Sequence, residues 1–561
     1  MAGALGSDRP LWDEPTEADV QCVREQLQRN VKDILGVAVR CRYGRPQVVV
    51  NRPLLWDGKA VDALPDEELD PKRVGVFPTL FWLTCPHLNR AIGRLESRGW
   101  VDRVKREIAA DPAAREQLEA AHRDTAAMRR ALVAEETLQR LEEMLPGHYR
   151  VLTASGVGGI QPTRGNTSAG DASGYDALGV KCLHAHFADY LARGKNPVGR
   201  KVWGLLTGAG VDPRGDRTCF AGSSCRCPGA ALAEKPSDPE ALVDIGSNSV
   251  RFLIGRAEAD GQVAVLHREL ITTRLGSGVS EHGELTARAV EDTLEALRTF
   301  RERAAEHGVA EPRAWGTSAL REARNRETFL IRAWEEAGVA VRVMSGEEEA
   351  IFSFRGALEV FRNQFAPDQP VVLADIGGGS TDIVLGSGGG SVVWTRSLPI
   401  GAVRLAQEIG NTVHAIDWQA FAGPVRAALE SGTADMPSRA EWPLFGLNED
   451  VANVVAVGGT ATTLAAIDLG LDAYNPARVN GHAVTLRQLR RWLDDLASLD
   501  ASARARIPGM PLERADIIVP GLIILHELVQ WLVEKGLGQP SCHISDSDLL
   551  QGVLVQVRGR Q

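Results

Sequence analysis

Two short segments of the chain combine an acidic residue, a glycine turn and small hydroxyl side chains. They are Val243-Asp-Ile-Gly-Ser-Asn-Ser249 and Ala374-Asp-Ile-Gly-Gly-Gly-Ser-Thr-Asp382. Glycines let backbone N–H groups approach an anion closely, and the serine, threonine and asparagine side chains add donors. An aspartate at the end of a strand could hold a hard divalent cation that bridges carboxylate and phosphate oxygens. These residue types therefore predict phosphate chemistry.

The two segments belong to an internal repeat. Residues 243–255 align without gaps on residues 374–386, at an offset of 131 residues. Each copy has an apolar strand, a tight turn and a second apolar strand. One copy alone could be an ordinary β-hairpin. Two copies favour a duplicated domain with a cleft between its lobes.

Three further segments could contribute to such a cleft. Gly458-Gly459 follows an apolar strand and opens a helix, and a helix N-terminus is a ready anion site. Ser345-Gly-Glu-Glu-Glu-Ala350 begins an amphipathic helix, where a carboxylate could serve as a general base or simply complement the helix dipole. Gly316-Thr-Ser-Ala-Leu-Arg321 places a cation after a similar strand and turn.

The elements that carry these residues lie in the second half of a chain of 561 residues. At about 150 residues per domain, this length predicts three to four domains. After residue 240, short β-rich runs alternate with helical ones, which is typical of an α/β fold. The apolar stretch Ile517–Leu532 contains Pro520 and Glu527 and is expected to be a buried helix rather than a membrane span. The N-terminus lacks the apolar core of a signal peptide, so we expect a cytoplasmic protein.

The first part of the chain differs in composition from the second. Residues 1–235 carry 33 Lys and Arg against 30 Asp and Glu, whereas residues 236–561 carry 30 against 43. The acidic second part argues against a nucleic-acid groove. We expect a hairpin within Gly36–Val50, long helices over Val101–Leu145, a glycine-rich loop at Thr153–Gly174 and a helix over Val180–Arg193. A segment rich in Gly, Pro, Ser and Cys (Cys219, Cys225 and Cys227) predicts a linker at 206–239.

The motifs of the second part resemble the exopolyphosphatase / guanosine pentaphosphate phosphohydrolase (Ppx/GppA) family. Besides the segments above, the resemblance includes Thr273-Arg-Leu-Gly276, Val519-Pro-Gly-Leu522 and Ser545-Asp-Ser-Asp548. It implies a duplicated actin-like, ribonuclease-H-like α/β fold, with lobe I at 240–355 and lobe II at 356–561. The chain has no His-Asp dipeptide, so it is similar to the short members without an HD-type domain.

The resemblance also implies roles for individual residues. Glu349 matches the catalytic base that activates water, with Glu348 as its competitor. The phosphate-binding and metal-associated positions are expected at two sets of residues: Ser247, Asn248, Arg321, Gly377, Gly378, Gly379, Ser380, Thr381, Gly458 and Gly459 for phosphate, and Asp244, Asp375 and Asp382 for Mg²⁺ or Mn²⁺. One departure from the family is Ile351, where many members have an arginine.

The first part resembles, more weakly, an actinobacterial family of unknown function. The match lies in Cys41-Arg-Tyr-Gly-Arg-Pro46, Phe77-Pro-Thr-Leu80 and Lys181-Cys-Leu-His184. We expect a small α+β domain at 1–205. Its thiols and imidazoles are expected to be buried rather than metal-binding, although a metal site stays open if they converge (Cys41, Cys85, His87, Cys182, His184 and His186).

The leading hypothesis is therefore a metal-dependent exopolyphosphatase that releases terminal orthophosphate from polyphosphate. Guanosine pentaphosphate 5′-phosphohydrolase is the alternative substrate hypothesis. A catalytically weak regulatory protein that binds guanosine tetraphosphate or polyphosphate is the third, and an actin-like kinase or chaperone is the fourth. No nucleic-acid or membrane partner is expected, and the chain could form a homodimer.

Overall fold

The computed structural model describes residues 12–28, 34–61, 63–65, 69–159, 178–215, 239–257, 263–410, 414–547 and 549–558. These residues form two compact units. Unit 1 contains Met1–Glu234 and Glu327–Ala340, and unit 2 contains Lys235–Arg326 and Val341–Gln561. The predicted linker cysteines and most of the predicted glycine-rich loop lie outside the described residues.

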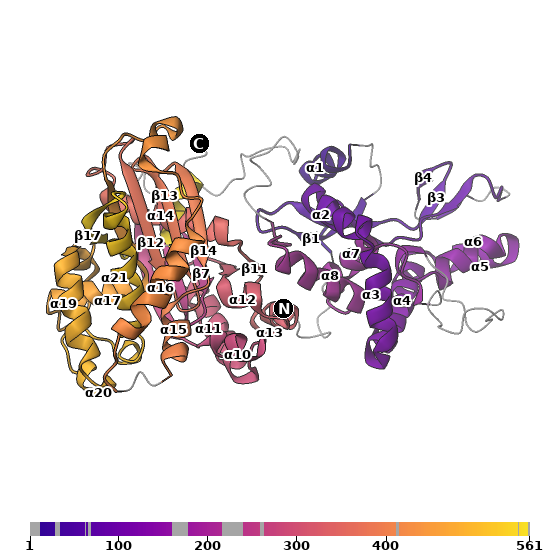
Figure 1. Cartoon of the computed structure of the whole chain (residues 1–561). Coiled ribbons are helices and arrows are strands. Elements are labelled where there is room, and N and C mark those ends of the chain that lie inside the picture. The colour runs from indigo at the N-terminus through magenta and orange to yellow at the C-terminus, as the bar shows by residue number, and fades with distance from the viewer. Residues whose placement is uncertain are drawn as a thin grey trace. The chain divides into compact units, whose positions relative to one another are not determined.

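Unit 1 is an α+β unit with two small antiparallel sheets, ordered β1-β2-β6 and β4-β3-β5. The predicted hairpin is confirmed, because β1 and β2 pair around the turn at Tyr43-Gly44. The predicted helices over 101–145 and 180–193 are also confirmed. The elements of unit 1 (Figure 1) are α1 (Glu17–Leu27), β1 (Ile34–Arg40), β2 (Pro46–Asn51), β3 (Leu54–Trp56), β4 (Lys59–Ala60), β5 (Val74–Val76), β6 (Phe81–Leu83), α2 (Pro86–Ser97), α3 (Trp100–Ala110), α4 (Pro112–Ala131), α5 (Glu135–Met144), α6 (Pro146–Ala154), η1 (Val157–Gly159), α7 (Leu183–Arg193), α8 (Pro197–Gly208) and α13 (Arg326–Ala337).

Helix α13 joins unit 1 although it is encoded more than a hundred residues after α8. Ile331 belongs to the same buried cluster as the apolar side chains of α7 and α8. Trp334 stacks on Trp203 with ring centroids 4.7 Å apart. Arg200 and Tyr190 both contact Glu335, at 2.8 and 3.1 Å. The chain therefore contributes to unit 1 twice.

Unit 2 contains two mixed sheets with the same central arrangement, and its elements follow in chain order (Figure 1). They are β7 (Glu240–Ile245), β8 (Ser249–Ala257), β9 (Val263–Thr272), η4 (Leu275–Gly278), α10 (Val279–His282), α11 (Ala287–Glu306), β10 (Arg313–Gly316), α12 (Ser318–Glu322), β11 (Val341–Val343), α14 (Gly346–Leu358), η5 (Glu359–Phe361), β12 (Pro370–Ile376), β13 (Thr381–Ser387), β14 (Val392–Leu398), α15 (Ala402–Ile409), α16 (Gln419–Gly432), η6 (Arg439–Phe445), β15 (Ala452–Val457), α17 (Gly458–Asp468), α18 (Pro476–Val479), β16 (Ala483–Thr485), α19 (Leu486–Ala497), α20 (Ala501–Arg504), η7 (Leu512–Arg514), α21 (Ile518–Glu534), β17 (Gly538–Ile544) and α22 (Leu549–Arg558).

The two sheets repeat one topology. The first has the order β11-β10-β7-β8-β9, and the second has the order β14-β13-β12-β15-β17-β16. In each sheet the first three strands in sequence are antiparallel, and two later strands add in parallel on the other side of the first one, β10 and β11 in the first sheet and β15 and β17 in the second. Strand β16 extends the second sheet alone, as an antiparallel edge strand beside β17. The predicted α/β fold with two homologous lobes is therefore confirmed.

Alternate residues of the strands face opposite layers, as the period of two requires. In β12, Val372 and Ala374 pack in the cluster that contains α17, α19 and α21, whereas Val371 and Leu373 pack against α14. Helix α21 is almost entirely buried, which confirms the prediction for Ile517–Leu532. Among the described residues, we find no helix with the length and hydropathy that crossing a membrane requires.

Helices α14 and α22 link the lobes by crossing each other. Helix α14 packs on the second sheet, and α22 packs on β7 and β8 of the first sheet. The crossing is close because Gly552 faces the backbone of α14, where an added Cβ would lie 1.8 Å from the carbonyl oxygen of Phe352. Helix α14 also carries Glu349 at its first turn. The contact between the lobes and the candidate base therefore share one helix.

Candidate active site

The two repeat segments form equivalent hairpins at the ends of β7 and β12. Asp244 pairs with Arg251 across the first hairpin, and Asp375 pairs with Asp382 across the second. The turns close alike: the Gly246 N–H donates to the Ser249 carbonyl at 3.0 Å, and the Gly377 N–H donates to the Ser380 carbonyl at 2.9 Å. The repeat read from the sequence is thus a repeat of backbone geometry.

In each turn, backbone carbonyls are bound by neighbouring N–H groups. The carbonyls of Gly377 and Gly378 accept from the first N–H groups of α15, at 2.9 Å each. The Ser247 carbonyl accepts from Gly276 N–H at 2.8 Å. Because the C=O and the next N–H of a trans peptide point in opposite directions, the N–H groups that follow are turned away from these partners. Such an arrangement suits an anion on the N–H side.

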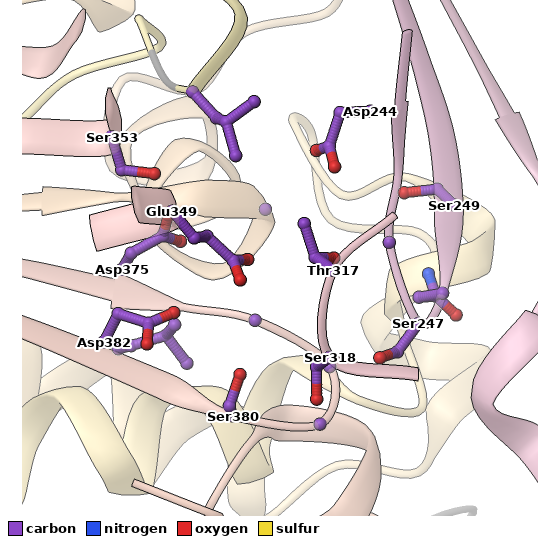
Figure 2. Close-up of a pocket in the computed structure, with 18 of the residues that line it drawn as sticks. Asp244, Ser247, Ser249, Thr317, Ser318, Glu349, Ser353, Asp375, Ser380 and Asp382 are labelled. Carbon is purple, nitrogen blue, oxygen red and sulfur yellow. The ribbon is translucent and has the colours of Figure 1, made fainter. Parts of the chain in front are cut away.

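A solvent-open pocket of about 650 Å³ lies between the lobes of unit 2. Figure 2 shows Glu349, Asp375 and Asp382 on one side and Asp244, Ser247 and Thr317 on the other. The pocket lining contains all the predicted site residues except Arg321, Thr381 and Gly458, namely Asp244, Ser247, Asn248, Glu349, Asp375, Gly377, Gly378, Gly379, Ser380, Asp382 and Gly459.

The three remaining predicted residues support the pocket from behind its lining. The Thr381 hydroxyl donates to the Ile400 carbonyl at 2.7 Å, and its side chain is fully buried. Gly458 has φ +85°, and an added Cβ would lie 3.0 Å from Oδ1 of Asp375. Arg321 donates to Oε2 of Glu349 at 2.5 Å. Arg321 therefore binds the candidate base instead of lining the pocket.

The structure separates the two competing glutamates. Ser345 caps α14, and Glu348 completes the capping box by accepting the Ser345 N–H at 3.2 Å. Glu348 also pairs with Arg342 at 3.2 Å. Glu349 instead lines the pocket, where its side chain is 14% exposed. Glu348 therefore caps the start of the helix, whereas Glu349 remains the candidate for the general base.

Glu349, Asp375 and Asp382 form one side of the pocket, which we call the acidic wall, and burial raises the pKa of two of these carboxyl groups. Burial raises the pKa of Glu349, while the charge of Arg321 opposes this rise and that of Asp375 adds to it. Burial also raises the pKa of Asp382 well above its ordinary value, and the charge of Glu349 adds to the rise. Clustered carboxylates with raised pKa values are typical of functional sites.

The structure adds two arginines that the sequence analysis missed. Arg251 and Arg514 line the pocket, and burial lowers the pKa of Arg514 to about 10. Arg251 stands at the repeat position of Asp382, so the alignment contained a signal for it. Arg514 approaches Gly459 so closely that an added Cβ would lie 2.2 Å from its guanidinium carbon. No spacing in the sequence marks Arg514.

Two carboxylates of the acidic wall could serve as ligands of a divalent cation. Asp375 and Asp382 face each other across β12 and β13, and Oδ1 of Asp382 is a buried oxygen for which the described residues offer no hydrogen-bond partner. Within the described ranges, no three His, Cys, Asp or Glu side chains are arranged as a complete metal site. The donors suit Mg²⁺, which often takes one or two carboxylates and completes its shell with water and substrate phosphates.

The candidate metal ligands of unit 1 are not brought together as a site within the described part of the chain. His184 lies 3.2 Å from Glu96 and 3.0 Å from the Asn89 carbonyl oxygen. His186 is buried and contacts Asn196 at 3.1 Å. Cys85 is also buried, and Cys41 and Cys182 are half-buried.

Comparisons with known proteins agree with this architecture. Residues 254–560 match the Ppx/GppA phosphatase family, and residues 37–204 match a family described as a protein of unknown function (DUF501). The chain is 32% identical over 328 residues to "Exopolyphosphatase 2" of Mycobacterium tuberculosis, covering 57% of this chain and 98% of that protein.

Two further similarities concern the same region. The chain is 30% identical over 292 residues to "Guanosine-5'-triphosphate,3'-diphosphate pyrophosphatase" of Vibrio campbellii, covering 52% of this chain and 54% of that protein. A crystal structure described as an exopolyphosphatase-like protein aligns with a TM-score of 0.51 at 26% identity, covering 58% of this chain and 98% of that one. Since the family match covers more than half of the chain, this protein is a hydrolase of the Ppx/GppA phosphatase family with a DUF501 domain before it.

Proposed function

We propose that this protein is an exopolyphosphatase, which hydrolyses the terminal phosphoanhydride bond of inorganic polyphosphate and releases orthophosphate. The observation that carries the proposal is the position of Glu349, a carboxylate with a raised pKa in a pocket walled by two glycine turns. The mycobacterial relative named exopolyphosphatase supports the choice of substrate.

The proposed reaction uses the residues of the pocket in separate roles. The backbone N–H groups around Gly378 and Gly379 bind oxygens of the terminal phosphoryl group, and Ser247 and Ser380 add hydroxyl donors. Glu349 orients a water molecule and accepts its proton, while the water oxygen bonds to phosphorus and the anhydride oxygen leaves with the shortened chain. Arg321 holds Glu349 in place. Positioning and charge stabilisation supply most of the catalysis in phosphoryl transfer.

Metal dependence is part of the proposal. Asp375 and Asp382 would hold Mg²⁺ or Mn²⁺, with Asp244 on the opposite side of the pocket (Figure 2). A bound cation would supply neutralisation of the charge on the phosphate oxygens. Arg251 and Arg514 provide positive charge in a part of the chain with a net negative charge, and we expect them to bind the phosphates that follow the terminal one.

A second candidate substrate is guanosine pentaphosphate, whose terminal 5′-phosphate is also attached through a phosphoanhydride bond. The similarity to the Vibrio pyrophosphatase favours this alternative. A regulatory protein that binds guanosine tetraphosphate or polyphosphate without turnover is the third candidate.

The test is a substrate panel with the full chain, run with Mg²⁺, with Mn²⁺ and with a chelator. Short polyphosphate, long polyphosphate and guanosine pentaphosphate are compared by phosphate release. We expect metal-dependent release from polyphosphate and a loss of about 10²–10⁴-fold in Glu349→Gln, the range for a missing general base. Glu348→Gln is the matched control and should keep its activity. Release that is equal in wild type and Glu349→Gln would contradict the assignment, and nucleotide binding without turnover would favour the regulatory alternative.

A further inference from the structure

A second hollow lies behind the glycine turn of the second lobe. It has a volume of about 310 Å³ and shares Gly378 and Gly379 with the pocket described above. Its wall includes two charged side chains, Glu322 at the end of α12 and Arg404 in α15. Ser247 and Ser318 also line both spaces, so the glycine turn and these two serines separate the pocket from the ion pair.

Arg404 connects this partition to the other lobe. Its Nε donates to the Gly379 carbonyl at 3.1 Å, and one terminal nitrogen donates to Oε2 of Glu322 at 2.9 Å. The other carboxylate oxygen of Glu322 accepts the Ser318 hydroxyl at 2.9 Å. Ser318 lines the pocket. One guanidinium thus joins a glycine of lobe II to a pocket residue of lobe I.

The contact at Gly379 has a directional consequence. Since the Gly379 carbonyl points to Arg404, the Ser380 N–H of the same trans peptide points the opposite way. A cation at the carbonyl also polarises the peptide and strengthens its N–H as a donor. Arg404 therefore orients a donor in the pocket without lining the pocket itself.

The glycine turn approaches the other lobe closely at Gly379. An added Cβ on Gly379 would lie 3.2 Å from the hydroxyl oxygens of both Ser247 and Ser318, so the two lobes touch at this residue. The Arg404–Glu322 pair is 25% and 42% exposed. A pair this exposed contributes little to stability, so its main effect is on geometry.

We propose that Arg404 is a positioning residue, which holds the Gly377–Ser380 turn against Ser318 and so fixes the donors that receive the transferred phosphoryl group. This inference rests on the proposed function in one respect, that the turn binds the terminal phosphate. It assigns a role in hydrolysis to a side chain outside the catalytic pocket.

The test compares Arg404→Ala and Arg404→Lys with Gln407→Ala, an exposed control on the same helix. Phosphate release from polyphosphate gives kcat and KM, and hydrogen exchange follows the amides of residues 377–381. We expect Arg404→Ala to lower kcat about 10–100-fold, the scale of a misplacement near 1 Å, with KM within about threefold because the other phosphates still bind. Exchange at 377–381 should accelerate, with an unchanged melting temperature.

Two further measurements separate positioning from folding. Arg404→Lys keeps the positive charge but lacks the planar guanidinium that donates to both Gly379 and Glu322. We therefore expect its kcat to lie between those of wild type and Arg404→Ala. Added guanidinium chloride at millimolar concentration should restore part of the activity of Arg404→Ala. The same addition should leave the activity of Gln407→Ala unchanged. In a double-mutant cycle with Glu322→Ala, the two losses should be less than additive.

The proposal is overturned if Arg404→Ala keeps kcat within about twofold of wild type, because a misplaced turn should lower kcat more than this. It is equally overturned if activity falls together with the melting temperature and guanidinium restores nothing. If the wild type hydrolyses neither substrate, the proposed function fails instead. Hydrogen exchange then still decides the role of Arg404, because unchanged exchange at 377–381 would overturn it.

Discussion

Glu349 has a raised pKa, and as the proposed base it should determine how the activity responds to low pH. The proposed base must be ionised to accept a proton, so we expect activity to be lost as the pH falls through a pKa that lies above the ordinary 4.5. We expect the acidic limb of kcat/KM above pH 4.5. Arg321→Ala should move this limb to higher pH, because the arginine charge opposes the rise. A pH–rate profile measures this, and a limb that stays in place or moves to lower pH would contradict it.

Asp382 is expected to destabilise the folded protein at neutral pH, where the unfolded chain would release its proton. Its folded pKa lies well above 3.8, so the folded protein holds this proton more tightly than the unfolded chain. Stability is therefore lost as pH rises from about 3.8 through the folded pKa. Near neutral pH with a chelator, Asp382→Asn should melt about 2 °C or more above wild type, or roughly 1 kcal/mol. Added Mg²⁺ should stabilise wild type more than the variant. Calorimetry gives both values, and a lower melting temperature for the chelated variant would exclude this account.

The sequence predicted many of the pocket residues because the repeat fixes them locally. Asp375, Asp382 and the glycines between them are close in the chain, and strand pairing alone brings them together. Arg514 could not be predicted in this way, since it reaches the pocket through the packing of η7 against Gly459. The position of Arg321 also depended on tertiary structure, because its partner lies on another helix.

At the scale of elements, the crossing of α14 and α22 is the contact most sensitive to volume. Gly552→Ala would place a methyl group 1.8 Å from the Phe352 carbonyl oxygen. We expect a loss of about 1–3 kcal/mol or more, as for other overpacked contacts. Activity should fall as well, because the displaced helix carries Glu349.

Gly93→Ala in α2 is the matched control for this prediction. It also places alanine in a helix, but an added Cβ there meets nothing within 4 Å. This substitution should stabilise the protein by about 0.5–1 kcal/mol through the helix preference of alanine. Denaturant unfolding compares the two variants, and equal stabilities would show that the crossing tolerates a larger separation.

The crossing itself was not predictable from the sequence. Strands, the glycine-opened helix α17 and the start of α14 all followed from local patterns. Gly356 and Gly552, however, lie in different parts of the chain, and neither is in a motif that indicates a helix contact. The fold shows that α14 packs on the second sheet and α22 on the first, and this pairing depends on tertiary structure.

At the scale of the whole molecule, α13 ties a piece of the phosphatase region into unit 1. Trp334 stacks on Trp203, and the Arg214 guanidinium lies 5.4 Å from the Trp334 ring centroid. We expect Trp334→Ala to destabilise unit 1 by about 2–3 kcal/mol, somewhat below the cost of a fully buried tryptophan. Hydrogen exchange of α7 and α8 measures this. Trp394→Ala in β14 of unit 2 is the control and should leave that exchange unchanged.

Unit 1 is built from two separate parts of the chain, Met1–Glu234 and Glu327–Ala340, and this leads to an expectation about related proteins. The mycobacterial relative matches over nearly its whole length without the first part of this chain. In such a protein, the counterparts of Ile331 and Trp334 would have no α8 to cover them. We therefore expect polar residues at these positions wherever the leading domain is missing, and apolar or aromatic ones wherever it is fused. An alignment sorted by domain content can check this, and it would reveal whether fusion to the leading domain changed the surface of the phosphatase.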